Sequence, residues 1–155
     1  MRVEIHKYGE IEVPEDLILH FPEGLHGFPG LRRGCLVLYS STPGLRWLQS
    51  VDDPSLAFLT IEPHFIFPDY EAELPDSDSL ALGLTEADQA AILTLVTISE
   101  DGSAITTNLL APIVINIRTR CARQVILETD GYLTRHAISS HIMGEIHAGA
   151  DAQNR

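Results

Sequence analysis

Short apolar runs separated by turn-forming residues restrict the fold of this chain more than any other sequence feature. The runs "CLVLY", "LRWLQS", "LAFLTI" and "RQVILE" are five or six residues long, and Gly, Pro or Asp stands near most of their ends. Runs of this length suit strands, whereas these three residue types favour turns. Roughly ten such runs follow one another at near-regular spacing, which predicts an antiparallel all-β sandwich or barrel.

One stretch, "PDYEAELPDSDSLALGLTEADQAA", breaks this rhythm. It carries acids and prolines, and Thr85 with Asp88 three residues later has the pattern of a helix N-cap. We therefore expect one or two short helices within an otherwise all-β domain.

Two later signals concern strand ends. Asp101-Gly102 stands between β-branched runs and predicts a hairpin, because both residues tolerate a positive φ. In the next run, "TTNLLAPIVIN", Pro112 removes a backbone donor from the strand. Asn108 and Leu109, just before it, therefore suggest a bulged edge that is open to pairing with an added segment.

The net charge of −12 is unevenly placed. Between Arg46 and Arg118 there is no Lys or Arg, and the same stretch holds twelve acids. These are Asp52, Asp53, Glu62, Asp69, Glu71, Glu73, Asp76, Asp78, Glu86, Asp88, Glu100 and Asp101. A negative field repels nucleic acid and attracts a basic protein. We expect no direct binding of nucleic acid, although surface acids can also serve solubility alone.

The N-terminus and the two cysteines indicate the compartment. The N-terminus lacks the pattern of a signal peptide, and no apolar run is long enough to cross a bilayer. Cys35 and Cys121 lie far apart without a metal-type or redox-type spacing, so reduced thiols are favoured over a disulfide. The prediction is a cytoplasmic protein with no membrane partner.

Catalytic and cofactor motifs are absent from the sequence. There is no GxSxG, GxxxxGK[ST] or GxGxxG, and the histidines match no compact metal pattern. Asp52 and Asp53 in "QSVDDPSLAF" precede Pro54 and are interpreted as turn residues, because neighbours on a strand face opposite sides. We expect no enzyme, cofactor or metal. Two alternatives remain: a hydrolase pairing Asp52 or Asp53 with Asp69, and a β-barrel with an apolar cavity for a small ligand.

Aromatic residues next to acids suggest a protein-binding surface in "IEPHFIFPDYE". Phe65, Phe67 and Tyr70 could serve as rigid anchors, with acids at their rim. The alternative, favoured for each ring taken alone, is that Phe65 and Phe67 share one strand face and fill the core.

Four segments resemble one known family. "LRWLQSVDDPSLAFLTIEP", "FPDYE", "TTNLLAPIVIN" and "GYLTRHAI", in this order and spacing, are similar to the flagellar assembly factor family FliW. The resemblance covers residues 1–138, which we expect to form a single β domain. Residues 139–155 fall outside it and have little core-forming pattern, so a flexible C-terminal tail is expected.

The resemblance implies a function and a fold. It implies strongly coiled antiparallel sheets that form a pseudo-barrel, and a non-enzymatic cytoplasmic regulator of flagellar assembly. It also implies two exchanging partners: flagellin, and CsrA, a basic RNA-binding repressor of flagellin translation. Motif matching and composition together give an expected partner surface. Its residues are Phe65, Phe67, Pro68, Asp69, Tyr70, Glu71, Asn108 and Leu109.

Overall fold

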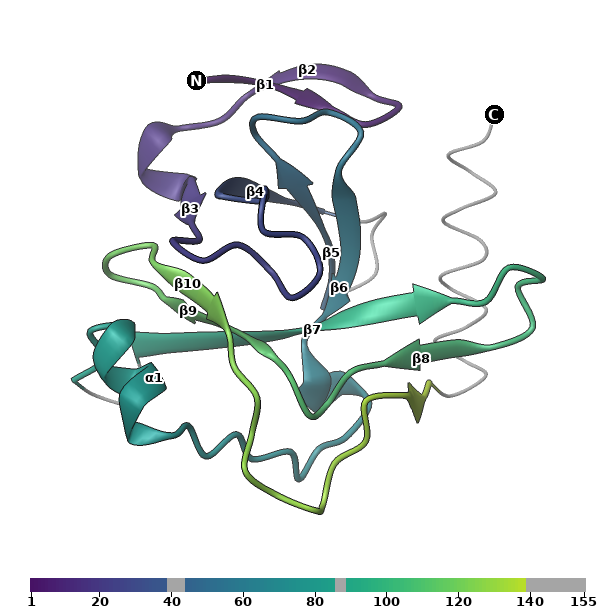
Figure 1. Cartoon of the computed structure of the whole chain (residues 1–155). Helices are drawn as coiled ribbons and strands as arrows, with labels where there is room; N and C mark the ends of the chain where they lie inside the picture. Colours follow the sequence, from purple (N-terminus) through teal and green to yellow (C-terminus); the bar gives the residue numbers. More distant parts are fainter. Residues whose placement is uncertain (39–43, 86–88, 139–155) are drawn as a thin grey trace.

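A computed structural model describes residues 1–38, 44–85 and 89–138 (Figure 1). Within these ranges the chain forms strands, two 3-10 turns and one short α-helix. The strands are β1 (Arg2–Ile5), β2 (Gly9–Glu12), β3 (Leu19–His20), β4 (Arg33–Leu38), β5 (Leu45–Ser50), β6 (Ala57–Ile61), β7 (Ala90–Ile98), β8 (Ile105–Thr107), β9 (Ile113–Asn116), β10 (Ala122–Gln124) and β11 (His136–Ala137). The helical elements are η1 (Glu15–Leu17), η2 (Pro63–Phe65) and α1 (Asp76–Ala81).

The observed elements confirm the all-β prediction with one short helix. Helix α1 lies in the acidic stretch where helix was expected. The N-cap predicted at Thr85 precedes residues 86–88, so the helix it would start lies outside the described residues, as does the tail of residues 139–155.

The strands pair antiparallel throughout the ladders of the described chain. Strands β1 and β2 form a separate hairpin, and the larger sheet runs β10-β9-β7-β6-β5-β4-β3, with β8 and β11 paired beside β7. Its two ends come together, because the His20 N–H donates to the Arg120 carbonyl at 2.8 Å and His20 forms an isolated bridge with Cys121. The sheet is therefore strongly coiled, and a single bridge rather than a ladder joins its ends.

Strand β7 connects the two halves of this sheet. Residues 90–93 pair with β9, residues 96–98 pair with β8, and Thr94 and Leu95 between them pair with β6. In Figure 1, β7 crosses the middle of the molecule, and β5 and β6 meet it at a steep angle. Because β6 and β8 both pair with β7, the segments that follow them both begin beside β7.

Buried hydroxyl groups lie where the two halves meet. Thr94 and Thr107 are buried, and their hydroxyl oxygens are 2.7 Å apart. The Thr107 hydroxyl also lies 2.8 Å from the Leu95 carbonyl oxygen. Because buried polar groups are costly without partners, these bonds favour this crossing over a slipped one.

The "VDDP" stretch is a turn between β5 and β6, as predicted. The Ser50 hydroxyl oxygen accepts bonds from the backbone N–H groups of Asp52 and Asp53. The Asp52 carboxylate pairs with Arg33 at 2.5 Å, and this hydrogen bond lowers the pKa of Asp52. Asp53 accepts bonds from the Ser55 hydroxyl and N–H, which lower the pKa of Asp53. Both carboxylates thus have local structural roles.

Gln49 ties this turn to the β1–β2 hairpin. Its side chain is fully buried, and its amide nitrogen donates to the carbonyl oxygens of Ser50 at 3.0 Å and Pro54 at 3.2 Å. Its side-chain oxygen accepts the His6 N–H at 2.9 Å. One side chain therefore serves two separate segments.

Replacing Gln49 with alanine should lower the free energy of unfolding by about 3 kcal/mol, because the His6 N–H and two carbonyl oxygens lose a buried partner. Urea denaturation measures this value. The exposed Glu4→Ala variant of the same hairpin is the control and should change it by less than about 0.5 kcal/mol. Equal effects of the two substitutions would show that the Gln49 bonds contribute nothing.

The Asp101-Gly102 hairpin gives a pH prediction. Gly102 has a φ of +74°, and Asp101 accepts bonds from Ser103 and Ser99, which lower its pKa to about 2. A lowered pKa stabilises the fold above the ordinary value of 3.8, and this stability disappears as pH falls toward 2. Asp101→Asn should therefore destabilise the protein at pH 7, and the difference from wild type should shrink between pH 4 and about pH 2.

Urea denaturation at pH 7, 5 and 3 measures this difference. Glu100→Gln, an exposed neighbour, removes the same charge and serves as the control. A difference for Asp101→Asn that stays constant across this range would contradict the role of the ionised carboxylate.

Candidate protein-binding surface

The aromatic motif lies on η2 and the turn that follows it. This segment is held by bonds within itself, from the Phe67 N–H to the Pro63 carbonyl and from the Tyr70 N–H to the Phe67 carbonyl, both 2.9 Å. Phe65 is 52% exposed, and one side of its ring covers Gly44, where a Cβ atom would come within 2.5 Å of the ring. Pro68 and Asp69 are exposed as well.

Tyr70 does not have the exposure expected of a surface anchor. It is 2% exposed, and its hydroxyl donates to the Leu109 carbonyl at 2.7 Å. Burial, and to a lesser extent Tyr132, raises the pKa of Tyr70 above its usual value. The side chain therefore joins the two motifs that the sequence singled out, because it connects the η2 turn to the chain after β8.

The strand edge at Asn108 and Leu109 is covered rather than open. The Asn108 side-chain oxygen accepts the N–H groups of Leu110 and Ala111, and the turn so formed separates β8 from β9, where a bulged edge was expected. Leu109 is fully buried, and its N–H donates to the Leu133 carbonyl at 3.0 Å. Strand β11 pairs with β8 beside it. The later chain segment thus occupies the edge to which an added segment was expected to pair.

A further aromatic residue, Tyr132, lies at this surface and was not among the residues predicted for it. Its hydroxyl oxygen accepts the Glu71 N–H at 2.7 Å, and its ring centroid lies 4.6 Å from that of Tyr70 and 5.6 Å from that of Phe67. Phe67 also contacts His136 edge-on, with centroids 5.6 Å apart. The segment that follows β10 therefore packs against the η2 turn. The motif "GYLTRHAI" contains Tyr132 and was the available signal.

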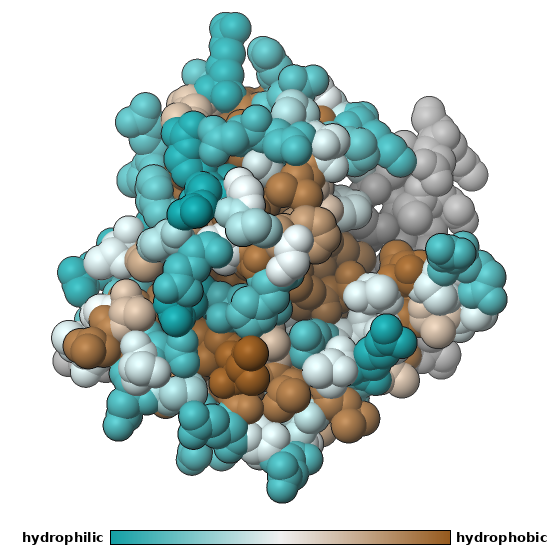
Figure 2. Space-filling view, in the orientation of Figure 1, coloured by the Kyte–Doolittle hydropathy of each residue, from teal (hydrophilic) through white to brown (hydrophobic). Residues whose placement is uncertain are grey.

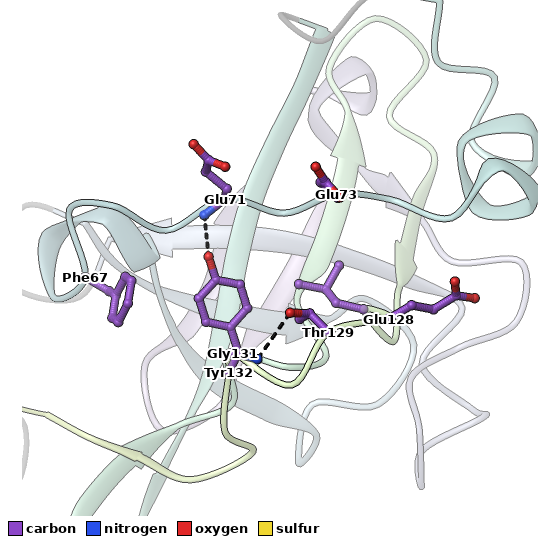
Figure 3. A pocket seen from close by; sticks show the side chains of 8 residues that line it. Phe67, Glu71, Glu73, Glu128, Thr129, Gly131 and Tyr132 are labelled. Atoms are coloured by element: carbon purple, nitrogen blue, oxygen red, sulfur yellow. Dashed lines mark hydrogen bonds between the residues drawn. The ribbon is translucent and has the colours of Figure 1, made fainter.

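A groove of about 290 Å³ lies between these two segments (Figure 3). Its lining consists of Phe67, Glu71, Glu73, Leu127, Glu128, Thr129, Gly131 and Tyr132. Three of these residues carry a carboxylate and two carry an aromatic ring, and no lining residue carries a positive charge. Glu71 and Glu73 come from one wall, and Glu128 comes from the other.

The acids of the cation-free stretch do not form one continuous surface. Asp52 and Asp53 lie on the β5–β6 turn, Glu100 and Asp101 on the β7–β8 turn, and Asp76 and Asp78 on α1, whereas Glu86 and Asp88 lie outside the described residues. Figure 2 shows hydrophilic side chains at several separate places of the visible face, with apolar residues between them.

Some of these acids also have cationic partners. Asp78, for example, accepts a bond of 2.7 Å from Arg123, which also pairs with Glu23 at 3.0 Å. The three acids that line the groove, in contrast, have no such partner among the lining residues.

The hydrolase alternative required Asp52 or Asp53 in one cleft with Asp69. The structure places the two aspartates before β6 and Asp69 beyond its other end, so the length of that strand separates them. The pKa values of Asp52 and Asp53 are lowered, whereas a carboxylic acid that donates a proton needs a raised pKa. This carboxylate pair is not assembled.

The structure also describes the cysteines, the possible metal ligands and the helices that the sequence analysis considered. Cys35 and Cys121 are free thiols. The described side chains of His, Cys, Asp and Glu nowhere gather in threes with a geometry that could hold a metal ion. A search of the same residues finds no helix with the length and apolar character needed to cross a membrane.

Comparison with known proteins identifies the family. A family model described as FliW protein matches residues 2–138. The flagellar assembly factor FliW of Heliobacterium modesticaldum is 36% identical over 138 residues, which are 89% of this chain and 90% of the relative. The protein of the same name from Natranaerobius thermophilus is 39% identical over 139 residues, 89% of this chain and 92% of the relative.

A solved structure supports the same assignment. A chain described as the crystal structure of the flagellar assembly factor FliW superimposes with a TM-score of 0.82 and 35% identity, and the match covers 91% of this chain and 99% of that chain. These findings confirm the resemblance that the four sequence segments suggested. The chain belongs to the FliW family.

Proposed function

We propose that this protein is a cytoplasmic, non-enzymatic flagellar assembly factor that binds flagellin and CsrA in exchange. The observation that carries this role is its likeness, over nearly the whole chain, to proteins named flagellar assembly factor. While flagellin is abundant in the cell, it occupies the factor. After flagellin is exported, the factor sequesters CsrA, and flagellin translation resumes.

The partner surface of this proposal centres on the η2 turn and the groove beside it. Phe65, Pro68 and Asp69 are exposed there, and Glu71 rims the groove that Phe67 lines. This surface is bordered by Tyr70, Asn108 and Leu109. Tyr70 and Leu109 are buried beneath it, and the Tyr70 hydroxyl donates a hydrogen bond to the Leu109 carbonyl. We assign contact to the exposed residues and support to the buried ones.

Electrostatics favours CsrA as a partner of this surface. Three carboxylates of the groove have no positively charged neighbour in its lining, so their field reaches solvent. CsrA is basic, and complementary charge raises association rates and helps orient partners. Salt screens such a field over about 8 Å at physiological ionic strength. Affinity for CsrA should therefore fall as salt concentration rises.

Charge reversal at the groove tests the surface. Glu71→Lys should weaken CsrA binding at least about tenfold at low salt, because it removes an attraction and adds a repulsion. Glu100→Lys makes the same charge change on the β7–β8 turn and should alter affinity by less than about twofold. Isothermal titration measures both affinities, after circular dichroism confirms that the variants are folded. Equal affinities of Glu71→Lys and wild type would remove this surface from the proposal.

Competition tests the exchange of partners. If flagellin and CsrA exclude one another, flagellin added to a complex with fluorescently labelled CsrA should release the label and lower its anisotropy. A Phe65→Ala variant is suited to this assay, because Phe65 is half exposed, whereas Tyr70→Ala would open the core. A stable complex of all three proteins, with the anisotropy still high at saturating flagellin, would contradict partner exchange.

A further inference from the structure

One wall of the acidic groove alternates in the manner of a strand. In residues 71–74, Glu71 and Glu73 are exposed and line the groove, whereas Ala72 and Leu74 are half-buried and pack against the core that contains Tyr70. Side chains two residues apart lie on one face of an extended chain. Figure 3 shows the Glu71 and Glu73 side chains on the same side of their segment.

The backbone of this wall has unused hydrogen-bonding groups. Within the described ranges, the N–H groups of Ala72, Glu73 and Leu74 and the carbonyl groups of residues 71–74 make no hydrogen bond to the chain. The preceding N–H, that of Glu71, bonds the Tyr132 hydroxyl across the groove. An extended segment whose backbone N–H and carbonyl groups are unpaired can serve as an edge strand, to which a strand of another protein pairs.

The opposite wall has the same property. The N–H groups of Glu128 and Thr129 make no hydrogen bond to any described residue, although Leu127 next to them bonds the Leu110 carbonyl at 2.9 Å. Both residues are exposed. The groove therefore lies between two stretches of chain, each with backbone N–H groups that bond no described residue.

We propose that this groove binds an extended segment of a protein partner that has Lys or Arg at alternate positions. The segment adds as a strand along residues 72–74, and its basic side chains pair with Glu71, Glu73 and Glu128. This proposal rests on the proposed function and deepens it, because CsrA, the basic partner, would supply the segment.

The geometry of the wall explains each part of this specificity. Side chains two residues apart on a strand are separated by about 7 Å, so alternate basic residues match the spacing of Glu71 and Glu73. A helix would leave the unused backbone groups of residues 72–74 without partners, because its own N–H and carbonyl groups are already bonded. A second copy of this chain would bring its own Glu71 and Glu73 against these carboxylates, and like charges across a strand pair repel.

Synthetic peptides of seven residues test the binding mode. The probe has three lysines at alternate positions with valine and threonine between them, and a peptide of the same composition with adjacent lysines is the control for charge. The alternating peptide should bind at least about tenfold more tightly, as measured by NMR titration. Glu73→Lys should abolish this preference, and Asp76→Lys on α1, outside the groove, should leave it unchanged.

Backbone methylation separates strand addition from simple charge attraction. Methylating the peptide nitrogens that face the protein should weaken binding at least about tenfold, whereas methylating the alternate set should matter much less. Amide exchange should slow, when the unmodified peptide binds, at those of residues 72–74 whose N–H groups face the added strand, because neighbouring N–H groups point to opposite edges. Equal binding of both methylated peptides, or unchanged exchange at residues 72–74, would overturn strand addition. So would slow exchange at these residues in the protein alone at high concentration, since a second copy would then occupy the groove.

Binding of full-length CsrA and flagellin, measured beside binding of the peptide, tests the proposed function and the strand-addition mode separately. If CsrA binds but the alternating peptide does not, the strand-addition mode is wrong and the proposed function stands. If the peptide binds as described but neither CsrA nor flagellin binds, the groove has the proposed specificity and the proposed function is wrong.

Discussion

The structure depends on one strand, β7, that pairs along its length with three others. Residues 90–93 hold β9, Thr94 and Leu95 hold β6, and residues 96–98 hold β8. Buried Thr94 and Thr107 bond at this crossing, so a shift of register would leave polar groups unpaired in the core. The η2 turn follows β6, and the Asn108 turn follows β8. The crossing therefore brings together two motifs that are far apart in sequence.

The groove is built from connections rather than strands. Tyr70 fills the space between the two motifs and leaves Phe65 and Phe67 nearer the surface. The Glu71 N–H bonds Tyr132, which positions the first wall relative to the chain after β10. Both walls rest on the same apolar cluster around Tyr70, Leu109 and Leu127. A rigid core thus supports residues whose own polar groups face solvent, as is common for binding sites on loops.

The sequence predicted the elements well and the exposure of individual residues less well. Turn chemistry located the "VDDP" and Asp101-Gly102 turns, because their conformations depend on local residues. The burial of Tyr70 and Leu109 depends on segments that pack from elsewhere, and an aromatic residue beside acids looks the same whether it faces in or out. For the same reason the acids appeared to form one surface, whereas the fold places them on several turns. Glu128 and Tyr132 were missed because they reach the groove from a segment about 60 positions later in the chain.

In the proposed function, a carboxylate-lined groove between two connections of the chain receives a basic protein. Hydrogen exchange of this protein, measured with and without CsrA, tests it most directly. We expect CsrA to slow amide exchange in residues 65–74 and 127–133 and to leave exchange in the β5–β6 and β7–β8 turns unchanged. Slower exchange confined to other surfaces, with residues 65–74 and 127–133 unaffected, would contradict it.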